Sequence, residues 1–284
     1  MTFLIDCHAL IASTDLARYP LAADAAPLEP GELEGFLSPA GLARALDGGA
    51  LRGAVLVQRG RLHGFDNRLV AQTAAADPRL RALCTVDTDA ADCAATAAGL
   101  LASPGVAGLR FMEPRKGADL GWLAGEGARS LWRLLAERGG IADVHVFPWN
   151  RAAGLEALAA LAAEFAEVPV LLDNIGGAAV EQGAPDFGVD AALARLAERP
   201  GVIFKFSEMT LGRLDRAGIN PPAAIARYAA IAGAGRLCWG SDVLPAGMVP
   251  EQAAANAVAA AEGLDAAGWQ AVLGGAAARL FGFD

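Results

Sequence analysis

Positive charge is scarce in this sequence, and lysine is the scarcest source of it. Only two lysines, Lys116 and Lys205, occur among 284 residues, and the formal net charge at pH 7 is −9. Such an acidic chain repels the phosphates of nucleic acids and the headgroups of anionic membranes. We therefore expect neither nucleic acid nor a membrane as a partner. The oligomeric state stays open, because no sequence feature bears on it.

Paired cysteines and long apolar runs are also missing. The four cysteines, Cys7, Cys84, Cys93 and Cys238, form no Cys-x-x-Cys motif. This scatter is typical of buried free thiols in a reducing compartment, so we expect a cytoplasmic protein. No stretch approaches the ~18 consecutive apolar residues of a membrane span. Asp6 interrupts the first apolar run, and no basic segment precedes it, so we expect no signal peptide.

The sequence does contain a regular alternation of short apolar runs and longer helical patterns. Strands that alternate with helices form parallel βαβ units, and eight such units in a chain of 284 residues are typical of a (β/α)8 TIM barrel, an α/β fold. The apolar runs are 3–6, 54–58, 82–87, 106–111, 142–147, 169–174, 202–207 and 237–242. The amphipathic helical segments include 38–47, 128–138, 155–167, 190–199, 221–232 and 250–262.

We predict a single domain over residues 1–284, because no linker, internal repeat or low-complexity tail divides the chain. A doubly wound open sheet is the alternative fold. No Gly-x-Gly-x-x-Gly motif follows the first run, which argues against dinucleotide binding. Residues 9–37 form a long segment rich in proline and acidic residues. Because it follows the first strand, we expect it to cover the barrel mouth.

Polar residues gather at the carboxyl end of nearly every predicted strand, where barrel enzymes carry their chemistry. The repetition is stronger evidence than any single residue, because the fold alone does not require polar groups there. The candidate site residues are His8, Gln58, Arg110, Lys116, His145, Asn174, Lys205, Ser207 and Asp242, with His63 in the loop after the second strand.

Each candidate also has a purely structural explanation. His8 can be a core histidine whose ring nitrogens are hydrogen-bonded within the protein. Asp242 can accept hydrogen bonds from backbone N–H groups, and His63 can be an exposed loop residue. Arg110 can hold an acidic neighbour. Lys205 has apolar residues on both sides, and a buried lysine is rare unless paired. It therefore either neutralises a nearby carboxylate or meets an anionic ligand.

Six stretches spread over nearly the whole chain carry a joint resemblance to a known family. They are IDCHALI (5–11), VLVQRGRLHGFDNRLV (55–70), GVAGLRF (105–111), VPVLLDNIG (168–176), VIFKFSE (202–208) and RLCWGSDVLP (236–245). Each alone is weak, but all six in this order resemble the amidohydrolase superfamily. More narrowly, they resemble its branch of 2-pyrone-4,6-dicarboxylate lactonase and sugar-lactone hydrolases.

The chain departs from this family at two candidate metal ligands. Leu10 stands where the family has a second histidine on its first strand, and residues 173–174 are Asp-Asn where the family has Asp-His. A catalytic zinc normally has three good protein ligands. A zinc site at His8, His145 and Asp242 is therefore disfavoured, and the resemblance to the branch implies a reaction without metal or cofactor.

The resemblance implies hydrolysis of a small, carboxylated lactone or a related cyclic ester. Asp242 is then the general base, with a pKa raised by desolvation. His8 polarises the carbonyl, and His145 supplies a second donor. Arg110 and Lys116 match positions that bind substrate carboxylates. Further substrate contacts are expected from Gln58, His63, Asn174, Lys205 and Ser207.

Three other functions fit the same barrel. A lactone isomerase needs a base but adds no water, and a nonoxidative decarboxylase normally keeps its metal. A non-catalytic homologue would bind its ligand without turnover. Against this last function, the chain keeps costly polar groups at its strand ends. The identity of the anionic small-molecule substrate does not follow from the sequence.

Overall fold

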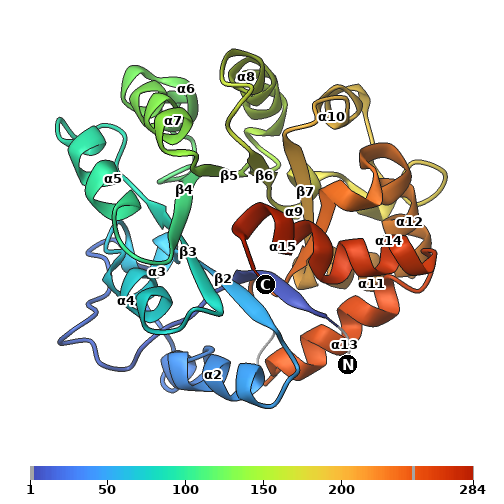
Figure 1. The fold of residues 1–284 in the computed structure, drawn as a ribbon, viewed down its shortest axis with the longest axis horizontal. Helices are drawn as coiled ribbons and strands as arrows, with labels where there is room; N and C mark the ends of the chain where they lie inside the picture. The colour runs from blue at the N-terminus through green and yellow to red at the C-terminus, as the bar shows by residue number, and fades with distance from the viewer. Residues whose placement is uncertain (1–2, 245–246, 284) are drawn as a thin grey trace.

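The structure, a computed structural model, describes residues 3–244 and 247–283. Its eight parallel strands form one sheet in which each strand pairs with the next along the chain. A bridge between Ala9 and Asp242 joins the last strand end to the first. Helices surround this nearly closed barrel (Figure 1). The predicted (β/α)8 barrel is therefore confirmed. Pro245, which ends the last motif quoted above, lies outside the described residues.

Each predicted apolar run overlaps a strand, with ends that differ by at most three residues. Both faces of a parallel sheet are covered, so its strands need apolar side chains toward the barrel interior and toward the helices. The strands are β1 (Ile5–Ala9), β2 (Gly53–Val57), β3 (Leu80–Thr85), β4 (Val106–Met112), β5 (Ile141–His145), β6 (Val170–Leu172), β7 (Val202–Ser207) and β8 (Leu237–Gly240).

The outer helices occupy the predicted segments, with ends that differ by about one turn at most. No helix among the described residues is long and apolar enough to cross a membrane. The α-helices are α1 (Glu32–Gly35), α2 (Pro39–Asp47), α3 (Gly60–His63), α4 (Arg68–Ala76), α5 (Cys93–Leu101), α6 (Gly121–Ala124), α7 (Glu126–Arg138), α8 (Arg151–Glu164), α9 (Asn174–Gly177), α10 (Ala191–Ala197), α11 (Glu208–Arg216), α12 (Pro221–Ala232), α13 (Pro250–Ala260), α14 (Ala266–Gln270) and α15 (Ala276–Phe281).

The barrel interior changes character along its axis. Near the amino ends of the strands it is apolar, with Ile5, Val55 and Leu171 packed in one cluster. Phe281 of α15 belongs to the same cluster and closes this end of the barrel. Near the carboxyl ends the interior holds charged side chains. The apolar layer is therefore a floor beneath the end of the barrel where chemistry is expected.

An irregularity in β1 determines where His8 points. The register between β1 and β2 shifts between Asp6 and Ala9, as in a β-bulge, which re-aims side chains. Asp6 Oδ1 accepts the backbone N–H of His8 at 2.9 Å and that of Ser241 at 2.8 Å. Gly240 lets β8 approach β1 closely, because a Cβ there would lie 2.4 Å from Cβ of His8. His8 consequently turns into the barrel beside β8.

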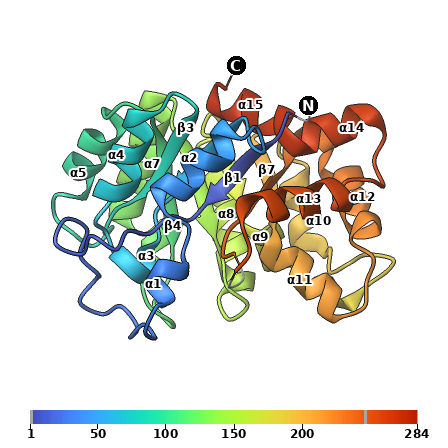
Figure 2. The same ribbon diagram turned by 90° about the horizontal axis from the view of Figure 1, so that it is seen from below.

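The segment 9–37, which contains α1, runs along the carboxyl end of the barrel near α3 (Figure 2). Its contacts hold it to one side of the barrel mouth: Tyr19 Oη donates to Gln72 of α4 at 2.9 Å, and the Ala22 N–H donates to the Leu62 carbonyl of α3 at 2.9 Å. These contacts place the segment beside the mouth. That it covers the mouth stays a prediction.

Candidate active site

A cavity of about 600 Å³ opens at the carboxyl ends of the strands. Leu10, Met112 and Phe147 form part of its apolar wall. The polar wall combines four arginines with two carboxylates, which suits a small ligand that has both apolar and anionic parts. The polar lining residues are Gln58, Arg59, Arg61, Arg110, His145, Asn174, Glu181, Arg213 and Asp242.

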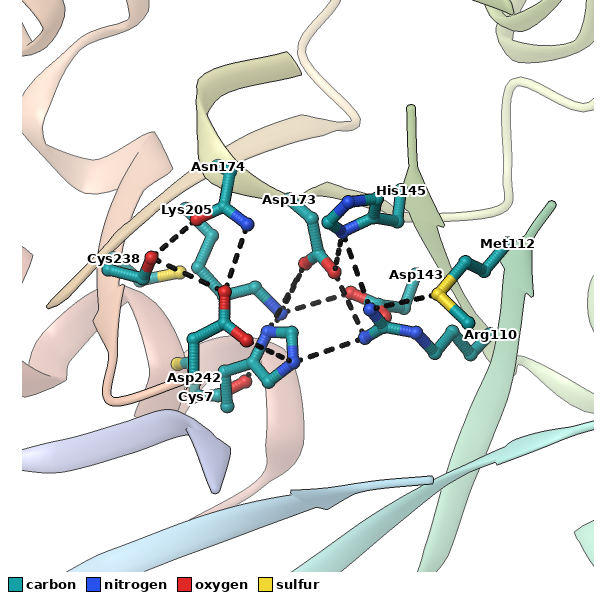
Figure 3. Close-up of polar contacts among 12 residues, drawn as sticks. Cys7, Arg110, Met112, Asp143, His145, Asp173, Asn174, Lys205, Cys238 and Asp242 are labelled. Atoms are coloured by element: carbon teal, nitrogen blue, oxygen red, sulfur yellow. Dashed lines mark hydrogen bonds and ion pairs between the residues drawn. The ribbon is translucent and has the colours of Figure 1, made fainter. Parts of the chain in front are cut away.

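Two cations and two carboxylates form a buried network beneath this cavity (Figure 3). Lys205 Nζ lies 3.1 Å from Asp143 Oδ1 and 2.5 Å from Asp173 Oδ1. Arg110 Nη1 lies 2.9 Å from Asp143 Oδ2 and 2.9 Å from Asp173 Oδ2. The charges balance, which matters because an unpaired charge buried in a protein costs several kcal/mol. Of the two expectations for Lys205, the structure shows the neutralised carboxylate.

The network keeps Asp173 and Lys205 charged despite their burial. Burial raises the pKa of Asp173, but Lys205 and Arg110 outweigh it and hold that pKa well below its usual value. Burial lowers the pKa of Lys205, but Asp143 and Asp173 more than offset this and raise it. Burial and the negative charge of Asp173 raise the pKa of Asp143. Asp173 is thus the carboxylate most firmly held in its ionised form.

Both candidate catalytic histidines contact this network. Arg110 Nη1 lies 3.2 Å from His8 Nε2, and Arg110 Nη2 lies 3.4 Å from His145 Nδ1. His8 Nδ1 is also 3.6 Å from Asp173 Oδ1, and His145 Nδ1 is 3.3 Å from Asp173 Oδ2. His145 lines the cavity, whereas His8 is fully buried. The two imidazoles therefore occupy different depths of one site.

Asp242, in the cavity wall, contacts side chains from the ends of three other strands. Its Oδ2 accepts the amide N–H of Asn174 at 2.9 Å, and its Oδ1 lies 3.6 Å from His8 Nε2. Ser207 Oγ donates to Asn174 Oδ1 and lies 3.5 Å from Asp242 Oδ2. The backbone N–H of Asp242 donates to the His8 carbonyl at 2.7 Å. Side chains from the carboxyl ends of β1, β6 and β7 therefore surround the carboxylate at the end of β8.

The pKa of Asp242 differs from the expectation. Burial raises this pKa, as predicted, but the neighbouring His8 imidazole and the Asn174 hydrogen bond outweigh burial and lower it overall. The prediction of a raised pKa is therefore wrong, because it counted desolvation and not the neighbours. At neutral pH Asp242 is ionised and free to accept a proton, with a lower proton affinity than a carboxylate in water.

The backbone at two of these positions adopts the left-handed region. Asn174 has φ 47° and Asp242 has φ 54°. Asparagine and aspartate tolerate this region better than most residues, and such conformations concentrate at functional sites. The turn after β6 brings the Asn174 amide to Asp242. The sequence signal for the contact between Asn174 and Asp242 is Asn174 itself, which stands where the family has a histidine.

The remaining candidates lie at varying distances from the cavity. Gln58 lines it, but its amide donates to the carbonyls of Gly64 and Asp66 at 3.0 and 2.9 Å. His63 Nδ1 lies 3.0 Å from the Pro20 carbonyl, outside the cavity wall. Lys116 is exposed, with Nζ 4.9 Å from the centre of the Trp149 ring. Lys205 and Ser207 lie beneath the wall.

Sequence reasoning missed several residues of this site. Asp143 precedes His145 by two positions on β5, so strand alternation places both side chains in the barrel. This alternation is a sequence signal for Asp143. Arg59 and Arg61 follow β2 within four residues, beside the predicted Gln58. Arg213, by contrast, lies on α11, well past β7, and no strand-end pattern marks it.

The arrangement of these residues does not fit a metal centre. In the described parts of the chain, no three His, Cys, Asp or Glu side chains are placed to hold a metal ion. His8 Nε2 and His145 Nδ1 both face the guanidinium of Arg110, a cation. Leu10 offers no ligand atom, and the Asn174 amide is engaged with Asp242.

Comparison with known proteins gives a consistent fold. The family model described as Amidohydrolase matches residues 5–283. An amidohydrolase from Burkholderia multivorans with bound zinc is 22% identical over 100% of both chains, with a TM-score of 0.73. A probable 2-pyrone-4,6-dicarboxylic acid hydrolase from Acinetobacter baumannii with bound citric acid is 19% identical over 99% of both chains (TM-score 0.72). The 5-carboxyvanillate decarboxylase from Sphingomonas paucimobilis is 16% identical over 100% of both chains (TM-score 0.69).

At these identities the solved structures show a shared fold and no shared substrate. No curated protein matches the chain at a significant level. The family model is the decisive comparison, because it spans the barrel from β1 to the end of α15. The resemblance predicted from the six sequence stretches is confirmed, and the chain belongs to the amidohydrolase family.

Proposed function

We propose that this protein is a hydrolase that opens a small, carboxylated lactone or related cyclic ester, with Asp242 as the base that activates water. The observation that supports this proposal most directly is the setting of Asp242. It is an ionised carboxylate in the cavity wall, and its two oxygens face Asn174 and His8. The anionic substrate class is supported by the arginines of the cavity. It also fits the name of the structural relative from Acinetobacter, which describes a cyclic ester with two carboxyl groups.

The reaction follows from the side chains that face the cavity. A water molecule at Asp242 gives up a proton to the carboxylate as its oxygen bonds to the lactone carbonyl carbon. The carbonyl electrons move to oxygen, and the N–H groups of Arg110 and His145 stabilise that charge. The ring C–O bond then breaks, and the proton on Asp242 passes to the leaving oxygen. The carbonyl re-forms, and the products are a hydroxyl group and a carboxylic acid, which releases its proton to solvent.

His8 has a positioning role in this proposal. It is fully buried and lies between Arg110 Nη1, at 3.2 Å from Nε2, and Asp242 Oδ1, at 3.6 Å from the same atom. A fully buried imidazole in these contacts holds the base and the guanidinium at a fixed separation. This differs from the expectation that His8 itself polarises the substrate carbonyl.

We also propose that the reaction needs no metal or cofactor. Lys205 and Arg110 place two positive charges against Asp143 and Asp173, where a divalent ion would otherwise have to neutralise the carboxylates. The relative from Burkholderia was crystallised with zinc. In the described residues of this chain, by contrast, no three possible ligand side chains are placed to hold a metal ion. A cytoplasmic location is part of the same proposal, in keeping with four buried free cysteines.

The test is a panel of small carboxylated lactones in water enriched in ¹⁸O. Hydrolysis releases acid and places one ¹⁸O atom in the new carboxylate. A lactone isomerase would convert the substrate without acid release or label. A decarboxylase, the activity named for the relative from Sphingomonas, would be tested with carboxylated aromatic acids and would release CO₂. Absence of labelled acid from every lactone would refute the proposed hydrolysis.

A further inference from the structure

Two arginines in the cavity wall have no carboxylate partner among the described residues. Arg59 and Arg61 flank the first residue of α3 and line the cavity. Arg110 is paired with Asp143 and Asp173 beneath the same cavity, and Arg213 forms an ion pair with Glu181. The cavity therefore contains two kinds of arginine, those already neutralised by the protein and those whose charge is still available.

Arg59 is held in place by an aromatic ring and without an ion pair among the described residues. Its guanidinium carbon lies 3.8 Å from the centre of the Phe36 ring, as in a stacked cation–π contact, which leaves the N–H groups at the guanidinium edge unused. Phe36 follows α1 directly and is half-buried. Arg61 is more exposed, with its guanidinium carbon 5.1 Å from the Phe147 ring centre. Arg59 is thus the better fixed of the two.

Arg59 and the base face the same cavity. Burial lowers the pKa of Arg59, while the negative charges of Asp242 and Glu32 favour its charged form. An arginine side chain stays protonated at any pH at which the protein is folded. A ligand carboxylate would gain more from this partly buried cation than from the solvated Lys116.

We propose that Arg59 binds a carboxylate of the substrate and thereby holds the cyclic ester against Asp242. This inference rests on the proposed function only in taking the ligand to be a small anionic ring compound. It reassigns the carboxylate-binding role expected of Arg110 and Lys116, because one is neutralised by two aspartates and the other lies outside the cavity wall. Phe36, from the segment 9–37, sets the position of the guanidinium.

The experiment measures binding of a ligand that cannot react. Isophthalate, a planar ring with two carboxylates, is titrated calorimetrically into the wild type, Arg59→Met and Arg59→Lys, with isophthalamide as the neutral isostere. We expect Arg59→Met to weaken isophthalate binding by about 10- to 100-fold, the range for a lost charge-assisted hydrogen bond. Arg59→Lys should recover part of the loss, because lysine keeps the positive charge but lacks the two parallel N–H donors with which a guanidinium binds a carboxylate. Isophthalamide affinity should not depend on Arg59.

The matched control is Arg52→Met, because Arg52 is exposed and lines a separate cavity of about 560 Å³ at the amino ends of the strands. It should leave isophthalate binding unchanged. An Arg59→Met protein that is folded by circular dichroism and binds isophthalate as the wild type does would overturn the inference. Failure of the wild type to bind isophthalate would overturn it as well.

The outcome is separable from that of the proposed function. If isophthalate binding depends on Arg59 but no lactone is hydrolysed, the binding assignment stands and the proposed hydrolysis is wrong. If lactones are hydrolysed and Arg59→Met changes neither KM nor isophthalate affinity, the hydrolase stands and Arg59 only packs on Phe36.

Discussion

Asp242 shows how the neighbours of a single carboxyl group decide its chemistry. The residue is almost fully buried, and burial alone would favour the protonated acid. The Asn174 amide and the His8 imidazole reverse that preference. The carboxylate is consequently ionised at neutral pH, and it can give a proton to a leaving group only after it has taken one from water.

We predict from this environment that Asp242 titrates below the reference value of 3.8. A base with a depressed pKa is active above that pKa, and its function is lost only as the pH falls through the lower, folded-state value. The measurement is carboxyl titration by ¹³C NMR on aspartate-labelled protein, with Asp242→Asn used to assign the resonance. A titration midpoint above 3.8 for this resonance would contradict the account.

At the scale of the elements, the junction of β1 and β8 positions both His8 and Asp242. The β1 bulge turns His8 inward, and Asp6 links the two strand ends through the N–H groups of His8 and Ser241. Gly240 allows the backbones of β1 and β8 to approach closely at His8. The site is therefore sensitive to backbone changes that never touch a substrate.

Replacement of Gly240 by alanine tests this junction. A Cβ at this position would lie 2.4 Å from Cβ of His8 and 2.8 Å from its backbone nitrogen, so β1 and β8 must separate. We expect a loss of about 1–3 kcal/mol in the free energy of unfolding, as for other overpacked core sites, measured by urea denaturation.

Gly99→Ala is the matched control for that prediction. Gly99 is exposed on α5 with nothing within 4 Å of a Cβ, so alanine there should stabilise the helix by about 0.5–1 kcal/mol. Equal effects of the two substitutions would show that the β1–β8 junction has no special requirement for glycine.

At the scale of the whole molecule, the barrel has three layers along its axis. An apolar floor at the amino ends supports a balanced layer made by Asp143, Asp173, Lys205 and Arg110, and the cavity lies above that layer. The two cations of this layer neutralise both carboxylates, which supports the proposal that the reaction needs no metal. It also makes stability and function depend on the same four residues.

We predict that Lys205→Met destabilises the protein by about 3–5 kcal/mol, because it leaves two buried carboxylates facing one arginine. The measurement is the free energy of unfolding at neutral pH. The depressed pKa of Asp173 stabilises the fold above the unfolded pKa of aspartate and stops doing so only as the pH falls through the lower folded value. Without Lys205 the pKa of Asp173 is higher, so acid protonates the carboxylate that has lost its partner. The difference in the free energy of unfolding between Lys205→Met and the wild type should therefore be smaller in mild acid than at neutral pH.

The other lysine of the chain is the control for Lys205. Lys116 is exposed and contacts the Trp149 ring, so Lys116→Met should change the free energy of unfolding by less than about 0.5 kcal/mol. If the two substitutions had similar effects, the buried network would not contribute to stability as described.

The alternation of apolar runs and helices was enough to predict the barrel, because period and length are local properties of the sequence. The strand-end rule also selected Arg110, His145, Asn174 and Asp242, all of which line the cavity. It could not assign partners: Lys205 pairs with Asp143 and Asp173 across the barrel, and such pairing depends on strand register. The pKa of Asp242 depends on Asn174 in the same way, since residues 68 positions apart meet only in the fold.

The most direct test of the central claim is the rate of lactone hydrolysis by Asp242→Asn and wild type in the presence of a strong chelator. We expect the wild type to keep its rate with chelator, and Asp242→Asn to lose about 100-fold or more, the usual contribution of a general base. Asp89→Asn, at an exposed position, should behave as the wild type. Loss of wild-type activity on chelation and its recovery with added Zn²⁺, or full activity of Asp242→Asn, would contradict the account.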